Sequence, residues 1–394
     1  VISNLKLRTS YGFTGNTEIG VYESLATLGS NSWTIGNQLV SGFYPNRIPN
    51  PDLKWEKTGQ FDIGFDLGLF NNRLRLTADY YYKKTTDLLY NVAIPSASGY
   101  DSMLKNIGSV QNKGYELSIE SDNLSGAFSW TTAFNISFNR NKVLELGGET
   151  YKDVGTYDDH LKTSDIRRLI VGQPIGVFYG YRFDGIFQNE AECAQQTSSP
   201  SPIGVGLRRY KDLNGDGKID ATNDREILGD ANPKFFGGMT NTFAYKGFEL
   251  NVFLQYSYGN KIFNYNAMEL ESPTGGQNVY QDLVNRWTPT NPSNEYQKAT
   301  TNRNNIVSDR FIEDGSFLKL KTVSLSYSFP KLNWKHLGGL RLYVTGQNLL
   351  TWTKYRGYDP EVSYRGASTL EAGEDFGGYP QARTFMFGIK LDIK

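Results

Sequence analysis

Apolar and polar side chains alternate along residues 55–90 in a pattern that predicts two antiparallel β-strands. Apolar residues occupy every second position of the first arm, and acidic residues and glycines stand between them. A period of two belongs to a strand and not to a helix. After the polar turn Asn71-Asn72 the second arm repeats the alternation, with charged residues on its other face. The apolar set is Phe61, Ile63, Phe65, Leu67, Leu69, Leu74, Leu76, Ala78, Tyr80 and Tyr82.

Both arms of this hairpin are longer than the strands of most soluble proteins. Soluble strands usually have about 5 or 6 residues, whereas these arms alternate over about the 9 to 11 residues that cross a bilayer at a tilt. One apolar face and one charged face over such a length are typical of a membrane barrel with a polar lumen. A long twisted hairpin on a soluble β-sandwich is the alternative that one hairpin leaves open.

The same design recurs along the chain, which favours the barrel. Each further segment again places apolar residues on one face and polar residues on the other. The predicted strands and hairpins lie within residues 4–14, 55–82, 115–138, 239–258, 317–344 and 385–393.

One strand departs from strict alternation. Between Phe317 and Phe329 the apolar positions move from Leu320 to Val323, so the phase slips by one residue. An extra residue in one strand of a pair has this effect. The pattern therefore predicts a β-bulge here.

Short and long connections alternate between the predicted strands. In membrane barrels short turns face the periplasm and long loops face outside. Counting back from the last strand gives about ten spans, and this parity assigns the strand-like segment Ile175–Phe187 to an extracellular excursion. Loops of this size are unusual on a closed barrel of about ten strands, so we expect a larger barrel. The long connections lie near residues 15–54, 91–108, 145–233, 267–315 and 355–382, of which 145–233 is a large extracellular loop region.

Composition agrees with an all-β membrane protein. Aromatic residues make up 14% of the chain, yet mean hydropathy is −0.49, and no run of about 18 apolar residues is present to form a membrane helix. The 41 basic and 41 acidic residues cancel, so charge gives no reason to expect nucleic-acid binding. The lone Cys193 excludes an internal disulfide framework. The chain opens on Val1-Ile2-Ser3 without a signal peptide, and we expect it to be a piece of something longer.

Several motifs, in order along essentially the whole chain, resemble the C-terminal half of the SusC/RagA family. These proteins are TonB-dependent transporters of the Bacteroidetes outer membrane. The resemblance implies a transmembrane antiparallel β-barrel of about 22 strands, of which residues 1–394 form roughly the C-terminal half, with long extracellular loops. The motifs are Asn50–Thr58, Gly172–Tyr181 with Asp184–Phe187, Asp212–Asp220, Asn232–Gly238 and Thr345–Glu361.

The resemblance also implies function and partners. It implies active import of an oligomeric nutrient through the outer membrane, with a SusD-like surface lipoprotein over the extracellular mouth and TonB acting on an N-terminal plug. The chain departs from the family because the plug and the TonB-contacting segment are absent. It also ends in Asp392-Ile393-Lys394, without the usual terminal aromatic residue. The cargo is predicted to be an oligosaccharide in preference to a peptide, although loop aromatics and lumen polar groups serve either.

An Asp-rich stretch is the sharpest chemical motif. Oxygen-bearing side chains at alternate positions, followed by glycine, resemble the first half of an EF-hand loop and predict a structural Ca²⁺. The twelfth position is Asn223 in place of a bidentate Glu, and the nearest carboxylate comes one residue late. An Asx-rich turn without metal is the alternative. The candidate ligands are Asp212, Asn214, Asp216, Lys218 through its carbonyl, Asp220 and Asp224.

Other candidate groups indicate no chemistry of their own. His160 and His336 lie far apart and have no metal-ligand spacing with Cys193, so loop or rim positions are expected. Alternate spacing of the strand carboxylates predicts lumen-lining residues and not acid/base pairs. Loop aromatics could stack on sugar rings or pack within the loops. The carboxylates are Asp62, Asp66, Asp79, Glu116 and Glu120, and the aromatics are Trp33, Tyr44 and Tyr100.

The sequence therefore predicts part of a transporter in the outer membrane and no enzyme. The rival from another class is a secreted, calcium-dependent adhesin or lectin built as a β-sandwich. That rival accounts for the loops and the Asp-rich stretch. It does not account for repeated strands of bilayer length with one apolar face.

Overall fold

A computed structural model describes most of the chain. The described residues are 1–394 except 17–21, 23, 94–97, 99, 101, 155–165, 273–277, 302–304, 330–336, 365, 367, 369 and 394. No helix in these described parts is long and apolar enough to span a membrane.

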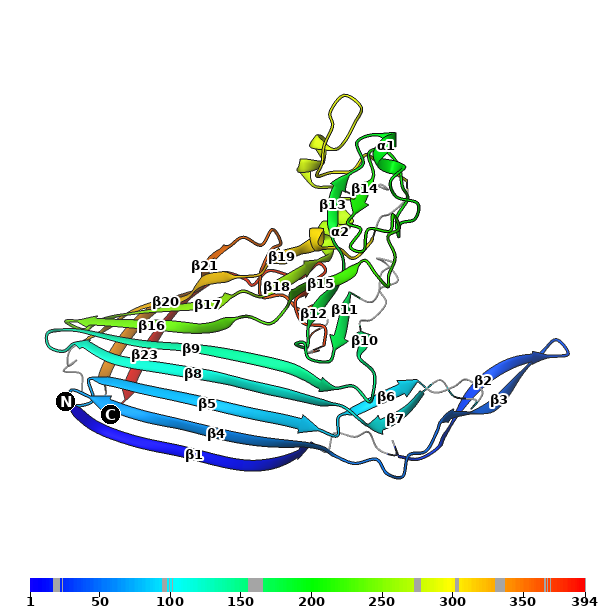
Figure 1. Ribbon diagram of the computed structural model, residues 1–394. Helices are drawn as coiled ribbons and strands as arrows, with labels where there is room; N and C mark the ends of the chain where they lie inside the picture. Colours follow the sequence, from blue (N-terminus) through cyan, green and yellow to red (C-terminus); the bar gives the residue numbers. More distant parts are fainter. Residues whose placement is uncertain are drawn as a thin grey trace.

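Ten long strands form one antiparallel sheet that curls into a trough (Figure 1). The strands follow one another in chain order, β1-β4-β5-β8-β9-β16-β17-β20-β21-β23, so each pairs with its neighbours along the meander. This number agrees with the ten spans predicted from loop parity. Their bounds are β1 Ile2–Asn16, β4 Glu56–Leu69, β5 Leu74–Thr86, β8 Ser109–Leu124, β9 Phe128–Glu145, β16 Phe235–Tyr245, β17 Phe248–Tyr258, β20 Phe317–Ser328, β21 Leu337–Thr353 and β23 Thr384–Ile393.

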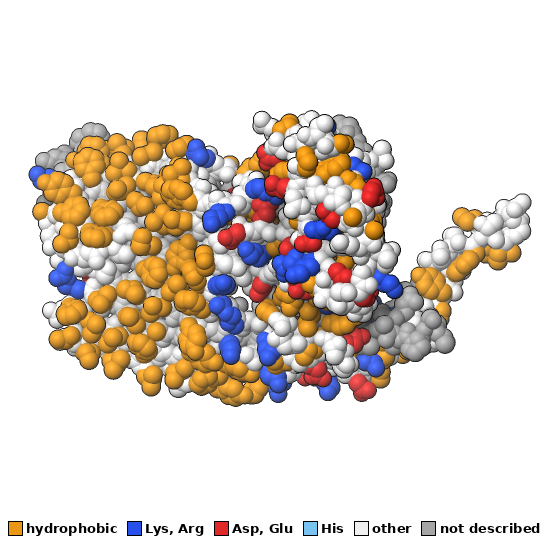
Figure 2. All heavy atoms as spheres, turned by 45° about the horizontal axis from the view of Figure 1, so that its top comes forward, with side chains coloured by type: hydrophobic (Ala, Val, Ile, Leu, Met, Phe, Trp, Pro, Cys, Tyr) orange, Lys and Arg blue, Asp and Glu red, His pale blue; other side chains and the backbone are white. Residues whose placement is uncertain are grey.

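The outer wall of the trough is apolar, as the alternation predicts. Phe61, Ile63 and Phe65 on β4 are exposed, and the glycine or acidic residues between them are less so. Figure 2 shows hydrophobic side chains covering this outer wall as a continuous field. Within the described residues no second sheet stacks on it. The soluble β-sandwich alternative is therefore wrong, because a sandwich buries its apolar face between two sheets.

The predicted bulge lies on β20. Pairing with both neighbouring strands passes from Leu320 to Thr322 and skips Lys321. The extra residue restores the apolar face for Val323 and Leu325, which pair with Val252 and Leu250 of β17. The phase slip in the sequence thus marks a bulge and not the end of a strand.

The long connections contain strands of their own at one end of the trough (Figure 1). Residues 15–54, predicted as a connection, include the projecting hairpin β2–β3, and residues 91–108 contribute to the short pair β6–β7. The segment Ile175–Phe187 lies outside the ten-stranded sheet, as parity predicted. The bounds are β2 Thr27–Ile35, β3 Gln38–Arg47, β6 Leu89–Ala93, β7 Ser102–Asn106, β10 Tyr151–Val154, β11 Arg167–Ile170, β12 Val177–Tyr181, β13 Phe183–Ile186, β14 Arg208–Tyr210, β15 Arg225–Asp230, β18 Lys261–Asn264, β19 Ile312–Asp314 and β22 Glu374–Asp375.

Three long connections pack together into one folded unit, which we call the loop assembly. It comprises residues 146–234, 259–316 and 354–383, and it contains two short α-helices, α1 Glu190–Cys193 and α2 Tyr265–Leu270. Two 3₁₀ turns, Gln281–Asn285 and Asp309–Phe311, complete it. Strand β18 of the second connection pairs in parallel with β22 of the third. The connections are thus joined to one another by backbone hydrogen bonds as well as by side chains.

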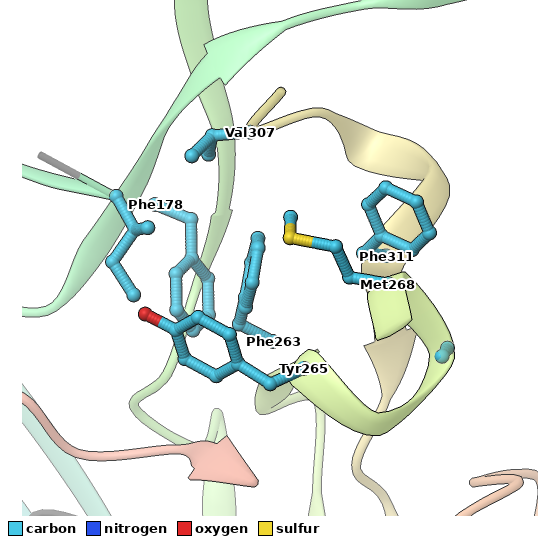
Figure 3. Close-up of a cluster of buried hydrophobic side chains, with 8 residues drawn as sticks. Phe178, Phe263, Tyr265, Met268, Val307 and Phe311 are labelled. Atoms are coloured by element: carbon cyan, nitrogen blue, oxygen red, sulfur yellow. The ribbon is translucent and has the colours of Figure 1, made fainter. Parts of the chain in front are cut away.

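The largest hydrophobic core lies in this assembly and not in the trough. Figure 3 shows Phe178 from the first connection against Phe263 and Tyr265 from the second. Phe263 and Phe311 are fully buried. The core cluster consists of Ile166, Phe178, Phe263, Tyr265, Ala267, Met268, Val307 and Phe311. The inner wall of the trough offers mostly polar side chains, so the main core forms between the loops.

Candidate functional site

The inner wall of the trough carries charges that neutralise one another. An Nη2 atom of Arg8 lies 3.1 Å from Asp66 and 3.0 Å from Asp79. On the next strands, Nε of Arg75 lies 3.0 Å from Glu120. These contacts join β1, β4, β5 and β8 across the lumen face.

The remaining strand carboxylates also fit a lumen wall. Asp62 accepts a hydrogen bond from the hydroxyl of Ser10 at 3.1 Å. Glu116 stands on β8 between two residues of the apolar outer face, so its side chain is on the polar side. The five carboxylates are distributed over the wall as predicted, and Asp79 stands directly opposite Glu116 in the strand register. Arg8 forms an ion pair with Asp79 at this point, which fits a charge-compensated lumen wall better than an acid/base pair.

A second charged cluster fixes the third connection to β20. The Nζ atom of buried Lys319 lies 2.6 Å from Asp359 and 2.6 Å from Glu361. Burial acts to raise the pKa of both carboxyl groups, but the hydrogen bonds and charge of Lys319, together with backbone N–H donors to Asp359 and Lys321 beside Glu361, outweigh it, and the pKa of each falls below its usual value. Both acids are therefore charged at neutral pH, and the loop is held over the mouth of the trough.

A cavity of about 750 Å³ lies where the inner wall meets the loops. Val110 and Val143 line it from β8 and β9, and Leu169 lines it from β11. Lys152 projects into the same region over the ring of Tyr90, 3.7 Å from its centre. Burial lowers the pKa of Lys152. The cavity therefore combines an apolar wall with a cation whose charged form is disfavoured by burial.

One face of the small sheet β10-β11-β12-β15 carries aromatic rings and guanidinium groups that alternate like the rungs of a ladder. The Arg168 guanidinium lies 3.9 Å from the ring centre of Tyr151 and 4.0 Å from that of Tyr179. The Arg225 guanidinium lies 5.1 Å from the ring centre of Tyr179. Asp153 holds Arg168 with two hydrogen bonds, of 2.6 and 2.9 Å. We call this arrangement the Tyr–Arg ladder.

The ladder borders a pocket of about 510 Å³. Thr222, from the Asp-rich loop, and Arg225 close one side, while half-exposed Tyr151 forms the other. Flat rings with adjacent carboxylate, hydroxyl and guanidinium groups can stack on a sugar ring and hydrogen-bond its hydroxyls. Sequence reasoning missed this pocket because its members come from four strands and a loop that are neighbours only in space.

The Asp-rich loop is folded by its own side chains. Asp212 accepts backbone hydrogen bonds from Gly215 at 2.6 Å and Gly217 at 2.7 Å. Buried Asp224 accepts from the backbone N–H groups of Leu213 and Asp220, both at 2.8 Å. These bonds place Asp224, one position late by the EF-hand pattern, at the centre of the loop. Asn214 accepts from the N–H of Asp216, and Asp216 accepts from the N–H of Lys218.

The electrostatics of this loop favour the ionised form of Asp220. Backbone N–H groups of Asn223 and Thr222 donate to Asp220 and lower its pKa. Among the described residues no cluster of three or more His, Cys, Asp or Glu side chains has metal-binding geometry. The calcium site stays a prediction.

The other candidates divide between the described and undescribed parts of the chain. His160 and His336 lie outside the described residues. Trp33 and Tyr44 stand on the β2–β3 hairpin, where their rings lie over Gly42 and Gly29, respectively. Both rings remain about two-fifths exposed, at 43% and 41%. Tyr100 is half-buried.

Comparison with known proteins gives consistent matches. Residues 1–186 match the family described as TonB dependent receptor-like, beta-barrel. TonB-dependent receptor P3 of Formosa agariphila is 41% identical over 99% of this chain and 39% of its own length. TonB-dependent receptor SusC of Bacteroides thetaiotaomicron is 29% identical over 100% of this chain and 38% of its own length. The solved RagAB peptide transporter superposes with a TM-score of 0.80 at 28% identity, covering 99% of this chain and 41% of that chain.

The chain belongs to the SusC/RagA-like TonB-dependent receptors. It spans about two-fifths of the length of the relatives that it matches. The predicted family and the predicted all-β barrel are confirmed.

Family membership also places the protein in the cell. Receptors of the SusC/RagA-like type lie in the outer membrane, and so does this barrel. The relatives are named receptors and transporters, which agrees with the prediction of a protein that is not an enzyme.

Proposed function

We propose that the complete protein actively imports an oligomeric nutrient across the outer membrane, driven through TonB. The observation that carries the proposal is the combination of a charge-neutralised lumen wall with a folded loop assembly at its extracellular end. A neutralised wall lets a polar cargo pass without holding it by net charge. The similarity to SusC and to the RagAB peptide transporter supports this reading.

A SusD-like surface lipoprotein is the proposed partner at the extracellular mouth. The β2–β3 hairpin projects away from the trough (Figure 1) and exposes large apolar side chains. Leu39 is 77% exposed and Phe43 is 76% exposed. Apolar side chains of this size in an extracellular segment favour burial against another protein. Contact with the lipoprotein through this hairpin would meet that need.

The cargo that we propose is a glycan. The Tyr–Arg ladder supports this choice, since it offers a half-exposed ring at Tyr151 beside hydrogen-bonding groups of Asp153 and Arg225. A peptide is the second candidate, and the likeness to the RagAB peptide transporter favours it. The apolar cavity of about 750 Å³ next to the inner wall would suit an apolar side chain of a peptide.

Uptake by the native host tests the function. We expect a strain without this receptor to lose uptake of a labelled oligosaccharide, and a proton-motive-force uncoupler to abolish uptake in the wild type. Unchanged uptake of both oligosaccharides and oligopeptides in the deletion strain would overturn import as the function.

A point variant tests the choice of cargo. Replacing Tyr151 with Ala removes the open end of the ladder, and we expect oligosaccharide binding by the complete receptor to weaken about tenfold. Tyr379→Ala is the matched control, since Tyr379 is 95% exposed in the third connection. Binding of oligopeptides, but not oligosaccharides, by the wild type would assign the peptide as cargo.

We also propose that the Asp-rich loop holds a structural Ca²⁺ that stiffens the loop assembly. Support comes from the spacing of Asp212, Asn214 and Asp216 and from the lowered pKa of Asp220. Asp224, buried at the loop centre, supplies the late carboxylate. With one amide, one carbonyl and four carboxylates available, weak affinity is expected.

A further inference from the structure

Four cations stand together on the outer wall at the extracellular end of the barrel. Lys84 lies on β5, Lys113 on β8, and Arg140 and Lys142 on β9. Each continues the outward-facing alternation of the apolar positions on its strand, and each is exposed. We call these four residues the outer basic cluster.

Strand register brings the four cations close together. Lys113 pairs directly with Arg140 across β8 and β9. Gln111 pairs with Lys84 on one side and with Lys142 on the other. Directly opposed residues have Cβ atoms about 5 Å apart. Like charges in this position destabilise a sheet unless something compensates them.

The described part of the chain does not supply that compensation. Within it, none of the four cations forms an ion pair with a carboxylate. Arg140 donates to the backbone carbonyls of Asn139 at 2.7 Å and Lys234 at 2.9 Å, and these bonds leave its charge unneutralised. On the inner wall, by contrast, Arg8 and Arg75 each meet two carboxylates. The sheet thus pairs Arg8 and Arg75 of its lumen face with carboxylates and, within the described residues, leaves these outer cations without an ion pair.

The cluster lies at the upper border of the apolar band. Figure 2 shows Lys and Arg side chains gathered in a row between the hydrophobic outer wall and the polar loops. The next outward positions toward the membrane centre are Tyr82, Tyr115 and Phe138. Aromatic side chains mark the interface of a bilayer, and cations just beyond them meet the lipid headgroups. The height of the cluster therefore matches that of headgroup phosphates in the outer leaflet.

We propose that the outer basic cluster binds the phosphate groups of an anionic glycolipid in the outer leaflet. The acyl chains of this lipid would lie along the apolar wall below, and its phosphates would bridge β5, β8 and β9. Two observations select a lipid as the occupant: the cluster is continuous with the lipid-covered wall, and its charge is opposite to that of the headgroup. A second copy of this chain would bring the same cations and increase the repulsion.

Lipid binding by the complete receptor tests the proposal. The purified protein in a neutral detergent is titrated with phosphorylated lipid A and with dephosphorylated lipid A, and bound lipid is counted by native mass spectrometry. The variant Lys113→Gln/Lys142→Gln removes two cations, each worth about a factor of five near an anionic lipid surface. We expect it to bind phosphorylated lipid A about 30-fold more weakly and to leave binding of the dephosphorylated lipid unchanged.

Matched controls keep the result interpretable. Lys211→Gln/Lys246→Gln carries the same charge change at an exposed loop position and at the β16–β17 turn, and it should bind like the wild type. Lys113→Arg/Lys142→Arg retains the charge and should retain binding. A folded barrel changes its gel mobility when it is boiled, and this heat-modifiable mobility shows whether each variant is folded. If the glutamine variant does not fold, wild-type affinity should still fall steeply with salt.

Two results would overturn the lipid site. One is equal affinity of the wild type for the two forms of lipid A. The other is an equal loss of affinity in the cluster variant and in the Lys211/Lys246 control. Either result would reduce the cluster to an ordinary solvated surface.

Discussion

The Nε atom of Arg167 lies 3.0 Å from Oε1 of Glu374, although 207 positions separate the two residues in the chain. Both side chains are almost fully buried, at 1% and 2% exposure. Arg167 also donates to the carbonyl of Gly176 at 2.8 Å and lies 4.3 Å from the centre of the Phe178 ring. A single guanidinium group thus joins the first connection of the loop assembly to the third.

Breaking this ion pair should loosen the loop assembly. Replacing Glu374 with Gln leaves a buried guanidinium without its counter-charge, and such losses cost about 3 to 5 kcal/mol. Hydrogen exchange in β11 and β22 should rise, while the ten-stranded sheet keeps its protection. Glu149→Gln, at an exposed position, is the control. Unchanged exchange in Glu374→Gln would show that the pair contributes nothing to the assembly.

Acid should weaken the attachment of the third connection. The pKa values of Asp359 and Glu361 lie below their usual 3.8 and 4.5 in the folded protein. A carboxyl group whose pKa is lower in the folded protein than in the unfolded chain stabilises the fold at pH values above its unfolded pKa. This stability is lost as the pH falls through the pKa of the folded state. Proteolysis of residues 354–383 should therefore be constant from neutral pH to about pH 5 and accelerate below about pH 4.

The variant Lys319→Met should weaken that pH dependence. Without the ammonium group, burial is opposed only by backbone N–H donors to Asp359 and by Lys321 beside Glu361, so the pKa of each carboxyl group is lowered less. Protonation then costs less ion-pair stability, and proteolysis of residues 354–383 should accelerate less in acid than in the wild type. Lys211→Met serves as the exposed control. A parallel pH profile in Lys319→Met and the wild type would contradict this account.

Truncating the aromatic core should destabilise the loop assembly and leave the sheet intact. Phe263 is fully buried and meets Phe178, Tyr265 and Phe311. Phe263→Ala should cost about 3 to 5 kcal/mol, the usual range for a buried Phe. Tyr379→Ala should cost less than about 0.5 kcal/mol because its side chain is almost fully exposed. Limited proteolysis reports the stability of the loop assembly, and gel mobility without boiling reports whether the barrel remains folded.

Deleting Lys321 should damage the barrel itself. Without the bulge, every residue of β20 on one side of the deletion moves to the opposite face. Leu318 and Leu320 would then point into the lumen, on the other face of the sheet from the apolar residues of β17 with which they pair in the wild type. We expect the deletion variant to lose heat-modifiable mobility, whereas Lys321→Ala keeps it. A folded deletion variant would show that the bulge is dispensable.

Calcium should protect the Asp-rich loop. Chelation with EGTA should expose residues 212–224 to proteolysis and lower the thermal stability of the loop assembly, and added Ca²⁺ should restore both. Asp216→Asn removes a charge without removing the side-chain oxygen, so it should weaken the response to Ca²⁺. Equal protection with EGTA and with Ca²⁺ would identify the loop as an Asx turn held by its own hydrogen bonds.

The barrel part of the fold was predictable because its signals are local. Alternation around Phe61 and Ile63 fixes a strand and its faces over a dozen residues, and the slip before Val323 locates the bulge. Loop parity then assigns Ile175–Phe187 outside the sheet. Each of these inferences needs only neighbouring residues or the order of the segments.

The loop assembly was not predictable in the same way. Its core and its ion pairs join connections far apart in the chain, as Arg167 and Glu374 illustrate, and no local period marks such a pairing. The Tyr–Arg ladder is hidden for the same reason, since Tyr151 and Arg225 meet only through two intervening strands. The β2–β3 hairpin was missed because its Gly and Ser residues resemble a connection.

The shared core of the loop assembly limits how such receptors can be recombined. Phe178 and Phe263 belong to different insertions, yet neither insertion can bury its aromatic residues alone. A chimera that exchanges only one insertion between relatives should mispack, whereas a chimera that exchanges all three together should fold. Specificity on this scaffold would therefore be inherited as a set, and substitutions in one insertion would require compensating changes in the other two.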